Sequence, residues 1–163
     1  MLINLKNKET LTYDDFSFKC SIGKNGLTFN KKEGDKKTPK GIYSLGPLFY
    51  RKDKNKEPHT KIKKIIINRK MGWCDDGTHK KYNKLIKIKK NIKHEKMFRN
   101  DDKYDFLIPI NYNTHATKKN KGSAIFIHLT KNYQKTLGCI ALKKNDFLIL
   151  LKLINKNTKI KIS

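Results

Sequence analysis

Short segments in which apolar and polar residues alternate recur along this chain of 163 residues. The pattern is clearest at Phe16, Phe18, Cys20 and Ile22. Successive side chains of a strand point to opposite faces, so this period of two predicts half-buried strands. Similar segments, rich in Ile, Phe and Tyr, are found at residues 1–6, 42–45, 64–68, 106–112, 123–129 and 158–162. The chain is therefore predicted to be mostly β.

Two of these segments carry further signals. Lys24-Asn25-Gly26 is a turn sequence, and residues 27–29 resume the apolar pattern after it, which predicts a hairpin. The C-terminal strand, residues 158–162, can lie at a sheet edge, where its lysines would guard against unwanted pairing.

A single segment predicts a helix. Asn145 can cap it, and residues 147–154 are almost all apolar, which indicates burial against the sheet. Residues 50–63 and 77–103 are dense in charge with weak hydrophobic periodicity, which predicts long surface loops or short helices. The length suits a single domain over residues 1–163, and no apolar run approaches the ~20 residues that a membrane span needs.

The net charge of +25 makes nucleic acid, anionic lipid or an acidic polymer credible partners. Arginine is the side chain that best recognises bases and phosphates in a bidentate way, yet Arg51, Arg69 and Arg99 are the only three. We therefore expect no specific nucleic-acid binding. A general drift of composition toward Lys, Asn and Ile remains the alternative explanation of the charge.

Cys20, Cys74 and Cys139 are odd in number and form no CxxC pair, so the sequence predicts neither a disulfide framework nor a zinc ribbon. Cys74 and His79 could be two metal ligands, but four converging ligands are not visible. We expect no metal and no organic cofactor.

His128 and Cys139 form the first candidate for catalysis, because each lies beside apolar residues within one short segment. A thiol with a pKa near ~8.5 is mostly protonated at neutral pH, and a nearby imidazole can remove its proton. The alternative is that His128 is a buried core histidine and Cys139 a small, inert apolar residue.

Four segments then resemble those of the L,D-transpeptidase catalytic domain family, of the YkuD type, and they follow in the family's order over residues 20–145. They are EGDKKTPKGIY at 33–43, GWCDD at 72–76 followed by YN at 82–83, GSAIFIH at 122–128, and TLGC at 136–139.

The resemblance implies an L,D-transpeptidase-type β-sandwich or distorted barrel with one helix of the C-terminal half packed on the sheet. Cys139 matches the nucleophile and His128 the general base. Such enzymes attack the carbonyl before D-alanine in a peptidoglycan stem peptide, release D-alanine and form a thioester. An amine of a second stem resolves it to a cross-link, or water resolves it to a trimmed stem.

The turn before the nucleophile suits this chemistry. Gly138 permits a tight turn, and the amides around Gly138 and Cys139 can stabilise an oxyanion, with Thr136 bracing the turn. His128 needs an acceptor on its second ring nitrogen, for which we expect a backbone carbonyl. An ordinary turn remains the alternative for Gly138 and Thr136.

Substrate contacts are expected from Trp73, Asp75 and Asp76, where an aromatic ring beside carboxylates could meet a sugar-peptide with a free ammonium. The alternative places Trp73 in the core and the aspartates in a turn. Tyr112 is a further candidate, because it follows a strand near the proposed cleft.

The chain departs from the common family pattern at Leu137 and Ala141, where many members carry histidine and arginine or asparagine, which implies altered substrate anchoring. The resemblance places the protein in the periplasm or cell envelope, whereas no secretory signal is visible at the N-terminus, which leaves the cytoplasm open. We expect a monomer. A non-catalytic module that binds peptidoglycan or, less favoured, nucleic acid is the competing hypothesis.

Overall fold

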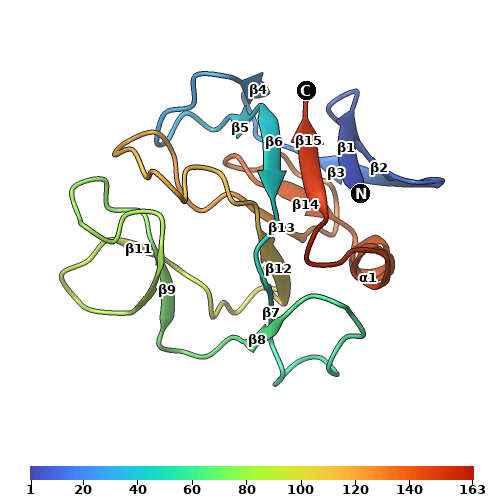
Figure 1. Ribbon diagram of the computed structural model, residues 1–163. Coiled ribbons are helices and arrows are strands. Elements are labelled where there is room, and N and C mark those ends of the chain that lie inside the picture. The colour runs from blue at the N-terminus through green and yellow to red at the C-terminus, as the bar shows by residue number, and fades with distance from the viewer.

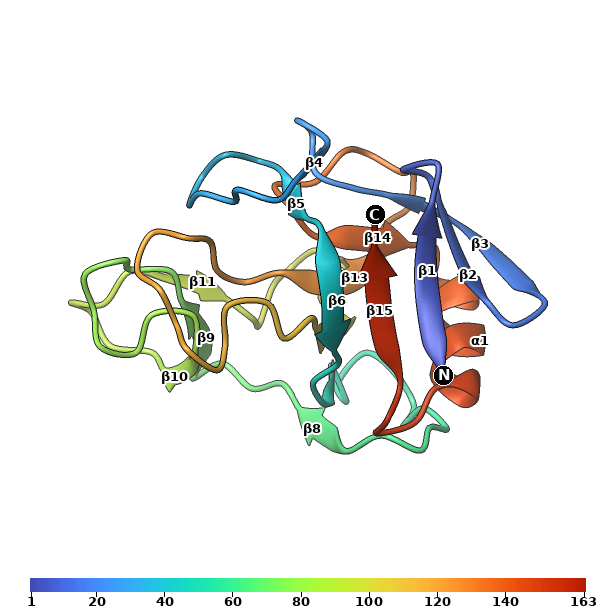
Figure 2. The ribbon, with the colours of Figure 1, turned by 45° about the horizontal axis from the view of Figure 1, so that its top comes forward.

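The alternating segments pair into one long, curled sheet. In the computed structural model, which describes residues 1–163, ten strands follow the order β6-β15-β1-β2-β3-β14-β13-β12-β7-β8 (Figures 1 and 2). Their bounds are β1 Leu2–Lys6, β2 Thr10–Tyr13, β3 Phe16–Ser21, β6 Gly41–Ser44, β7 Leu48–Tyr50, β8 Lys64–Ile66, β12 Phe106–Pro109, β13 Phe126–Leu129, β14 Ile140–Leu142 and β15 Lys159–Ile162. The sheet forms a half-barrel, and the predicted mostly β class is confirmed.

Two smaller sheets complete the fold. β9 (Met71–Cys74) lies between β10 (Leu85–Lys87) and β11 (His94–Lys96), and we call this three-stranded unit, with its loops, the β9–β11 lobe. β4 (Leu27–Thr28) pairs with β5 (Thr38–Pro39). In both views the lobe lies at the opposite side of the curled sheet from the helix (Figures 1 and 2).

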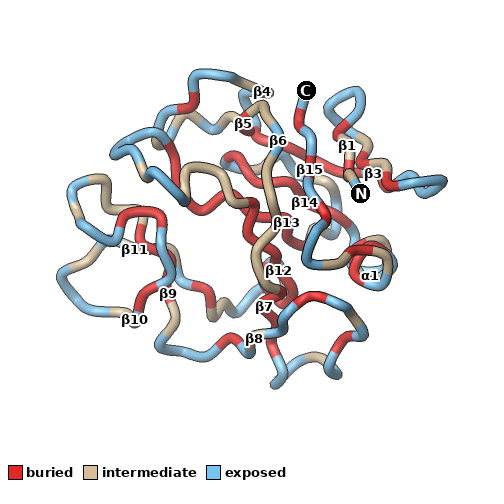
Figure 3. Tube along the Cα trace, viewed as in Figure 1, coloured by how far each residue is buried: buried red, intermediate tan, exposed pale blue.

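The one helix, α1 (Lys144–Leu153), packs on the inner face of the sheet, as the sequence predicts. Its apolar residues Phe147, Leu150 and Leu151 are buried in the larger of two cores, where the Phe147 ring stacks on Phe106. The buried residues run through the centre of the molecule along β7, β12 and β13 (Figure 3). No helix of the structure has the length and apolar character needed to cross a bilayer.

The second core lies on the opposite face of the same strands. Phe49, Leu107 and Phe126 point into it, and the β9–β11 lobe contributes Trp73 and Met97. Alternation along each strand thus sends every second side chain toward α1 and the others toward the lobe. The sheet is therefore covered on both faces at β7, β12 and β13.

Three local predictions are wrong. Residues 27–29 do not return beside β3, because β2 and β14 occupy both edges of that strand; β4 pairs instead with β5. β15 is not an edge strand, because it lies between β1 and β6. The cap of α1 is Lys143, which makes no side-chain capping bond, and Asn145 lies inside the first turn.

The charged stretch 77–103 is also more structured than its composition predicts. It contains β10 and β11, and it buries Ile86 and Met97 in the fold. In the stretch 50–63, predicted as loops or short helices, Tyr50 ends β7 and residues 51–63 form a loop without strand or helix.

The packing of α1 leads to a stability prediction. Phe147→Ala removes a fully buried ring and should lower the free energy of unfolding by about 3–5 kcal/mol. Ile149→Ala, on the half-exposed side of the same helix, should cost less than about 1 kcal/mol. Urea unfolding of both variants measures the difference, and equal losses would show that α1 does not pack as described.

Candidate active site

Of the two sequence-predicted catalytic residues, His128 lies in β13 and Cys139 comes directly before β14, the parallel neighbour of β13. β13 and β14 pair with Ile127 opposite Ile140 and His128 opposite Ala141. Ile127 and Ile140 belong to the larger core, so His128 must point to the other face, and Cys139, one residue before Ile140, points to that face as well. Strands about 4.8 Å apart with a rise of about 3.3 Å per residue put the two Cα atoms about 8 Å apart.

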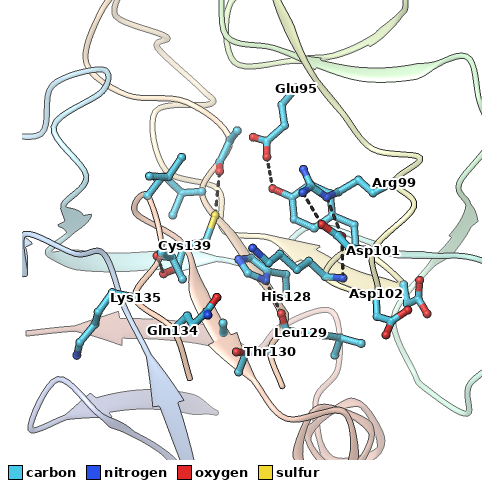
Figure 4. Close-up of a pocket in the computed structure, with 18 of the residues that line it drawn as sticks. Glu95, Arg99, Asp101, Asp102, His128, Leu129, Thr130, Gln134, Lys135 and Cys139 are labelled. Atoms are coloured by element: carbon cyan, nitrogen blue, oxygen red, sulfur yellow. Dashed lines mark hydrogen bonds and ion pairs between the residues drawn. The ribbon is translucent and has the colours of Figure 1, made fainter. Parts of the chain in front are cut away.

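Both side chains line one large cleft between the sheet and the β9–β11 lobe. Its volume is about 1180 Å³, and its wall includes His128, Ala141 and Cys139 from the sheet with Glu95 and Tyr104 from the lobe side. Figure 4 shows the imidazole and the sulfur at this same cavity. The structure thus brings together the histidine and the cysteine that the sequence pairs.

The Cys139 sulfur is held by two backbone groups at the floor of the cleft. The Phe126 N–H donates to Sγ at 3.4 Å, and the thiol donates to the carbonyl of Ala124 at 3.2 Å. Only 8% of Cys139 is exposed. Burial and the nearby Glu95 carboxylate raise the pKa of the thiol to about 12, so the resting group is a neutral thiol at pH 7.

The His128 imidazole is also neutral at rest. Its Nδ1 lies 2.9 Å from the Leu129 carbonyl, which fixes the proton on Nδ1 and leaves Nε2 as the basic nitrogen. This contact matches the expected backbone acceptor. Burial, with smaller contributions from the positive charges of Lys103 and Arg99, lowers the pKa of His128 to about 4. Tyr104 meets the ring edge-on at 5.4 Å between centroids.

The turn before Cys139 has the geometry that the sequence indicates. Gly138 has φ +140, and a Cβ there would lie 2.9 Å from the Lys37 carbonyl, so only glycine fits. The Thr136 hydroxyl accepts from the Gly138 N–H at 3.1 Å and donates to the Cys139 carbonyl at 2.6 Å. The Gly138 amide is thereby used inside the turn, and the Cys139 N–H has no acceptor within the protein.

Three carboxylates, Glu33, Asp75 and Glu95, line the lobe side of the cleft. Glu95 accepts from the Tyr104 hydroxyl, and Glu33 accepts from Ser123 at 2.7 Å. Asp75 Oδ1 is buried without a hydrogen-bond partner. Burial raises the pKa of both Asp75 and Glu95. Glu95 and Tyr104 were not found from the sequence, because they lie in segments with no motif that marks their position. Glu33 begins the segment at 33–43 that resembles the family, but it was not singled out as a site residue.

The mouth of the cleft carries the opposite charge, supplied by Lys36, Lys103, Lys131, Lys135 and Lys144. Lys131 pairs with Asp102 at 2.7 Å, and Arg99 pairs with Asp101 through two bonds of 2.9 and 2.6 Å. Figure 4 shows this arginine pair beside His128.

The remaining sequence-predicted residues lie outside the lining of the cleft. Trp73 is in the second core, where its indole N–H donates to Asn83 at 2.9 Å. Asp76 accepts from the backbone and hydroxyl of Thr78 and closes a turn. Tyr112 packs edge-on against Tyr43. For Trp73 and Asp76 these are the structural roles that the sequence left open as alternatives.

No group of three or more metal-ligating side chains is present. Cys74 Sγ lies 4.0 Å from His79 Nδ1, and no third ligand joins them.

Comparison with known families identifies the kind of domain that contains this cleft. The profile of the L,D-transpeptidase catalytic domain (YkuD) matches residues 1–162. The chain belongs to this family. An L,D-transpeptidase domain is therefore built from nearly the whole chain, and its matched range includes both His128 and Cys139. A comparison with curated protein sequences gives no match.

Solved structures support the fold of this L,D-transpeptidase domain. It is similar to the helical cell shape determining protein Pgp2 from Campylobacter jejuni, with 23% identity and a TM-score of 0.50, and to its K307A mutant, with 22% identity and a TM-score of 0.52. Each match covers 99% of this chain and 45–46% of the Pgp2 chain. The chain thus spans less than half the length of these proteins.

The buried, neutral imidazole predicts a loss of stability in acid. Its pKa of about 4 lies below the unfolded value of 6.5, so between these two pH values the unfolded state binds a proton that the folded state does not. The contribution of this buried histidine to the free energy of unfolding is therefore fully present above pH 6.5 and is lost as the pH falls toward 4. We expect wild type to lose about 2–3 kcal/mol more than His128→Gln between pH 7 and pH 4, measured by urea unfolding. The exposed His115→Gln is the control, and parallel losses in wild type and His128→Gln would contradict the prediction.

Proposed function

We propose that this domain is a cysteine acyltransferase that acts on peptidoglycan stem peptides, with Cys139 as nucleophile and His128 as general base. The observation that carries the proposal is their shared cleft: Nε2 of His128 is free while Nδ1 is held by Leu129, and the sulfur is fixed on the same face of the sheet. Family membership supports the substrate class.

The proposed reaction begins with a neutral thiol and a neutral imidazole. Because burial favours both neutral forms, no thiolate–imidazolium pair forms at rest, and the proton passes from Sγ to Nε2 only as the sulfur attacks the carbonyl before D-alanine. The unpartnered Cys139 N–H is the donor best placed for the developing oxyanion, with the turn held by Thr136 and Gly138.

His128 then returns its proton to the departing D-alanine amine, which leaves a thioester on Cys139. An amine of a second stem completes L,D-transpeptidation, and water completes an L,D-carboxypeptidase-like hydrolysis. Neither outcome needs a metal or an organic cofactor. Such a substrate places the working protein in the cell envelope.

Asp75 is proposed to bind an ammonium group of the stem peptide. Its Oδ1 is buried, has no partner in the protein and lies in the cleft beside Glu33. A buried carboxylate oxygen without a partner is costly, and a substrate ammonium would supply the missing hydrogen bond and charge.

The alternative function is a non-catalytic module that binds peptidoglycan. The observation in its favour is the thiol itself, which is buried and has a pKa of about 12, as an inert structural cysteine would. The two functions differ in whether Cys139 ever forms a covalent bond with a substrate.

The deciding experiment incubates the protein with a tetrapeptide stem, or with a carbapenem as an acylating probe, and detects an adduct by intact mass. We expect one adduct on Cys139 and none in Cys139→Ala. His128→Ala should slow acylation by roughly 100-fold or more. Cys74→Ala is the matched control and should acylate as wild type does. No adduct on wild type with either reagent would support the binding module instead.

The ammonium contact has its own test. Acylation rates are compared for a stem that carries a free side-chain ammonium and for the same stem acetylated there. Wild type should prefer the free ammonium by roughly 10-fold or more, and Asp75→Asn should lose that preference, since a charged hydrogen bond contributes about 1.5–3 kcal/mol. Asp76→Asn, whose carboxylate closes the neighbouring turn, should retain it. A preference that survives Asp75→Asn would remove Asp75 from substrate binding.

A further inference from the structure

The segment before β13 is tied to the β9–β11 lobe at Gly122 and Ala124, and at Ser123 between them to Glu33 of the loop that joins β4 to β5. The Gly122 N–H donates to the Tyr82 hydroxyl at 3.0 Å, the Ser123 hydroxyl donates to Glu33 at 2.7 Å, and the Ala124 N–H donates to Asn83 Oδ1 at 3.0 Å. Tyr82 and Asn83 form the YN motif, which has no role in the reaction as proposed above. The lobe therefore holds the backbone that leads into the histidine strand.

Asn83 is the centre of this arrangement. Its Oδ1 accepts from the Trp73 indole at 2.9 Å as well as from Ala124, and its Nδ2 donates to the carbonyls of Tyr112 and Asn113, each at 2.9 Å. The residue is 3% exposed and has φ +58. All four hydrogen-bonding positions of the amide are filled, which fixes its orientation.

Ala124 joins Asn83 to the nucleophile. It has φ +51, a left-handed conformation that residues with a Cβ adopt rarely and that surrounding contacts must hold. Its N–H is bound by Asn83, and its carbonyl accepts the hydrogen bond of the Cys139 thiol at 3.2 Å. The amide of Asn83 and the sulfur of Cys139 are thus hydrogen-bonded to the N–H and to the carbonyl of the same constrained residue.

We propose that Asn83 is a positioning residue for Cys139, and that it sets the place and hydrogen bonding of the sulfur through Ala124. Asn83 does not line the cleft and would not touch the substrate. The consequence for acyl transfer rests on the proposed function, whereas the effect on the thiol itself does not.

Two effects follow from loss of the Asn83 contact. A sulfur displaced by about 1 Å can lose up to about 100-fold in an oriented attack. A thiol that loses its carbonyl acceptor ionises more easily, because that hydrogen bond stabilises the protonated form. The other groups near the sulfur are Glu95, Lys31, Tyr104 and His128, and none of them is a hydrogen-bond partner of Asn83.

The test uses Asn83→Gly, because glycine adopts the left-handed conformation without strain and removes only the side chain. Acylation by a carbapenem is measured by intact mass. Alkylation by iodoacetamide is measured across pH on the Cys139 peptide. We expect acylation to fall by roughly 10- to 100-fold, while the alkylation midpoint moves to lower pH by about half a unit.

Two further variants separate positioning from general destabilisation. Asn83→Asp keeps the acceptor for Trp73 and Ala124 and should recover most of the wild-type midpoint. Asn111→Leu removes a comparable hydrogen bond, from Asn111 to Ser44 at 2.9 Å, and should change neither the acylation rate nor the alkylation midpoint of Cys139. If Asn83 had only a structural role, the pH midpoint of Cys139 alkylation in the folded protein would stay unchanged.

A folded Asn83→Gly variant with wild-type acylation and a wild-type midpoint would overturn the proposal. An Asn83→Asp variant whose alkylation midpoint lies about half a pH unit or more below that of wild type would also overturn it. This criterion needs only the wild-type midpoint, so Asn83→Asp carries the test if Asn83→Gly does not fold. If wild type accepts no acyl group, the proposed function fails, and the alkylation midpoint still decides whether Asn83 sets the thiol.

Discussion

The parallel pairing of β13 with β14 is the interaction on which the candidate site depends. Its register sets Ile127 beside Ile140 in the larger core, and this burial forces His128 and Cys139 to the opposite face. A slip of one residue would send the apolar set into the cleft and His128 and Cys139 into the core. The burial of Ile127 and Ile140 on one face of the sheet thus fixes the register that holds His128 and Cys139 on the other face.

The β9–β11 lobe provides what the sheet alone lacks. It covers the second face, so that the cleft has two walls, and it supplies Glu95 on one of them. It also reaches the segment before β13 through Tyr82 and Asn83, at the point where that segment meets the sulfur. A lobe assembled from a charged stretch with little apolar content is held partly by these directed hydrogen bonds, which makes its position more dependent on single side chains than that of α1.

The parts predicted from sequence were those fixed by local pattern. Alternation located β1, β3 and β15, and the apolar run located α1, because period and burial are properties of the segment itself. The family motifs paired His128 with Cys139, and both residues line the same cleft, while their catalytic roles stay a prediction. Strand partners were not predictable in the same way. The turn at residues 24–26 is present, with Gly26 at φ +80, but the residues after it do not pair with β3, because β2 and β14 already pair with both edges of that strand. The positions of Glu95 and Tyr104 depend on the folding of long charged loops, for which no periodic signal exists.

The net charge of the chain does not decide the state of its candidate nucleophile. A charge of +25 would lower the pKa of a thiol if it acted evenly, yet the pKa of Cys139 is raised. Lysines in solvent are screened over about 8–10 Å, whereas burial and the Glu95 carboxylate act at short range in a less polar medium. For His128 burial is again the largest cause, and there the neighbouring Lys103 and Arg99 lower the pKa in the same direction. In the proposed reaction, activation of the thiol would therefore come from a change inside the cleft when a ligand enters, such as a substrate ammonium that compensates the acidic wall, and not from the basic surface.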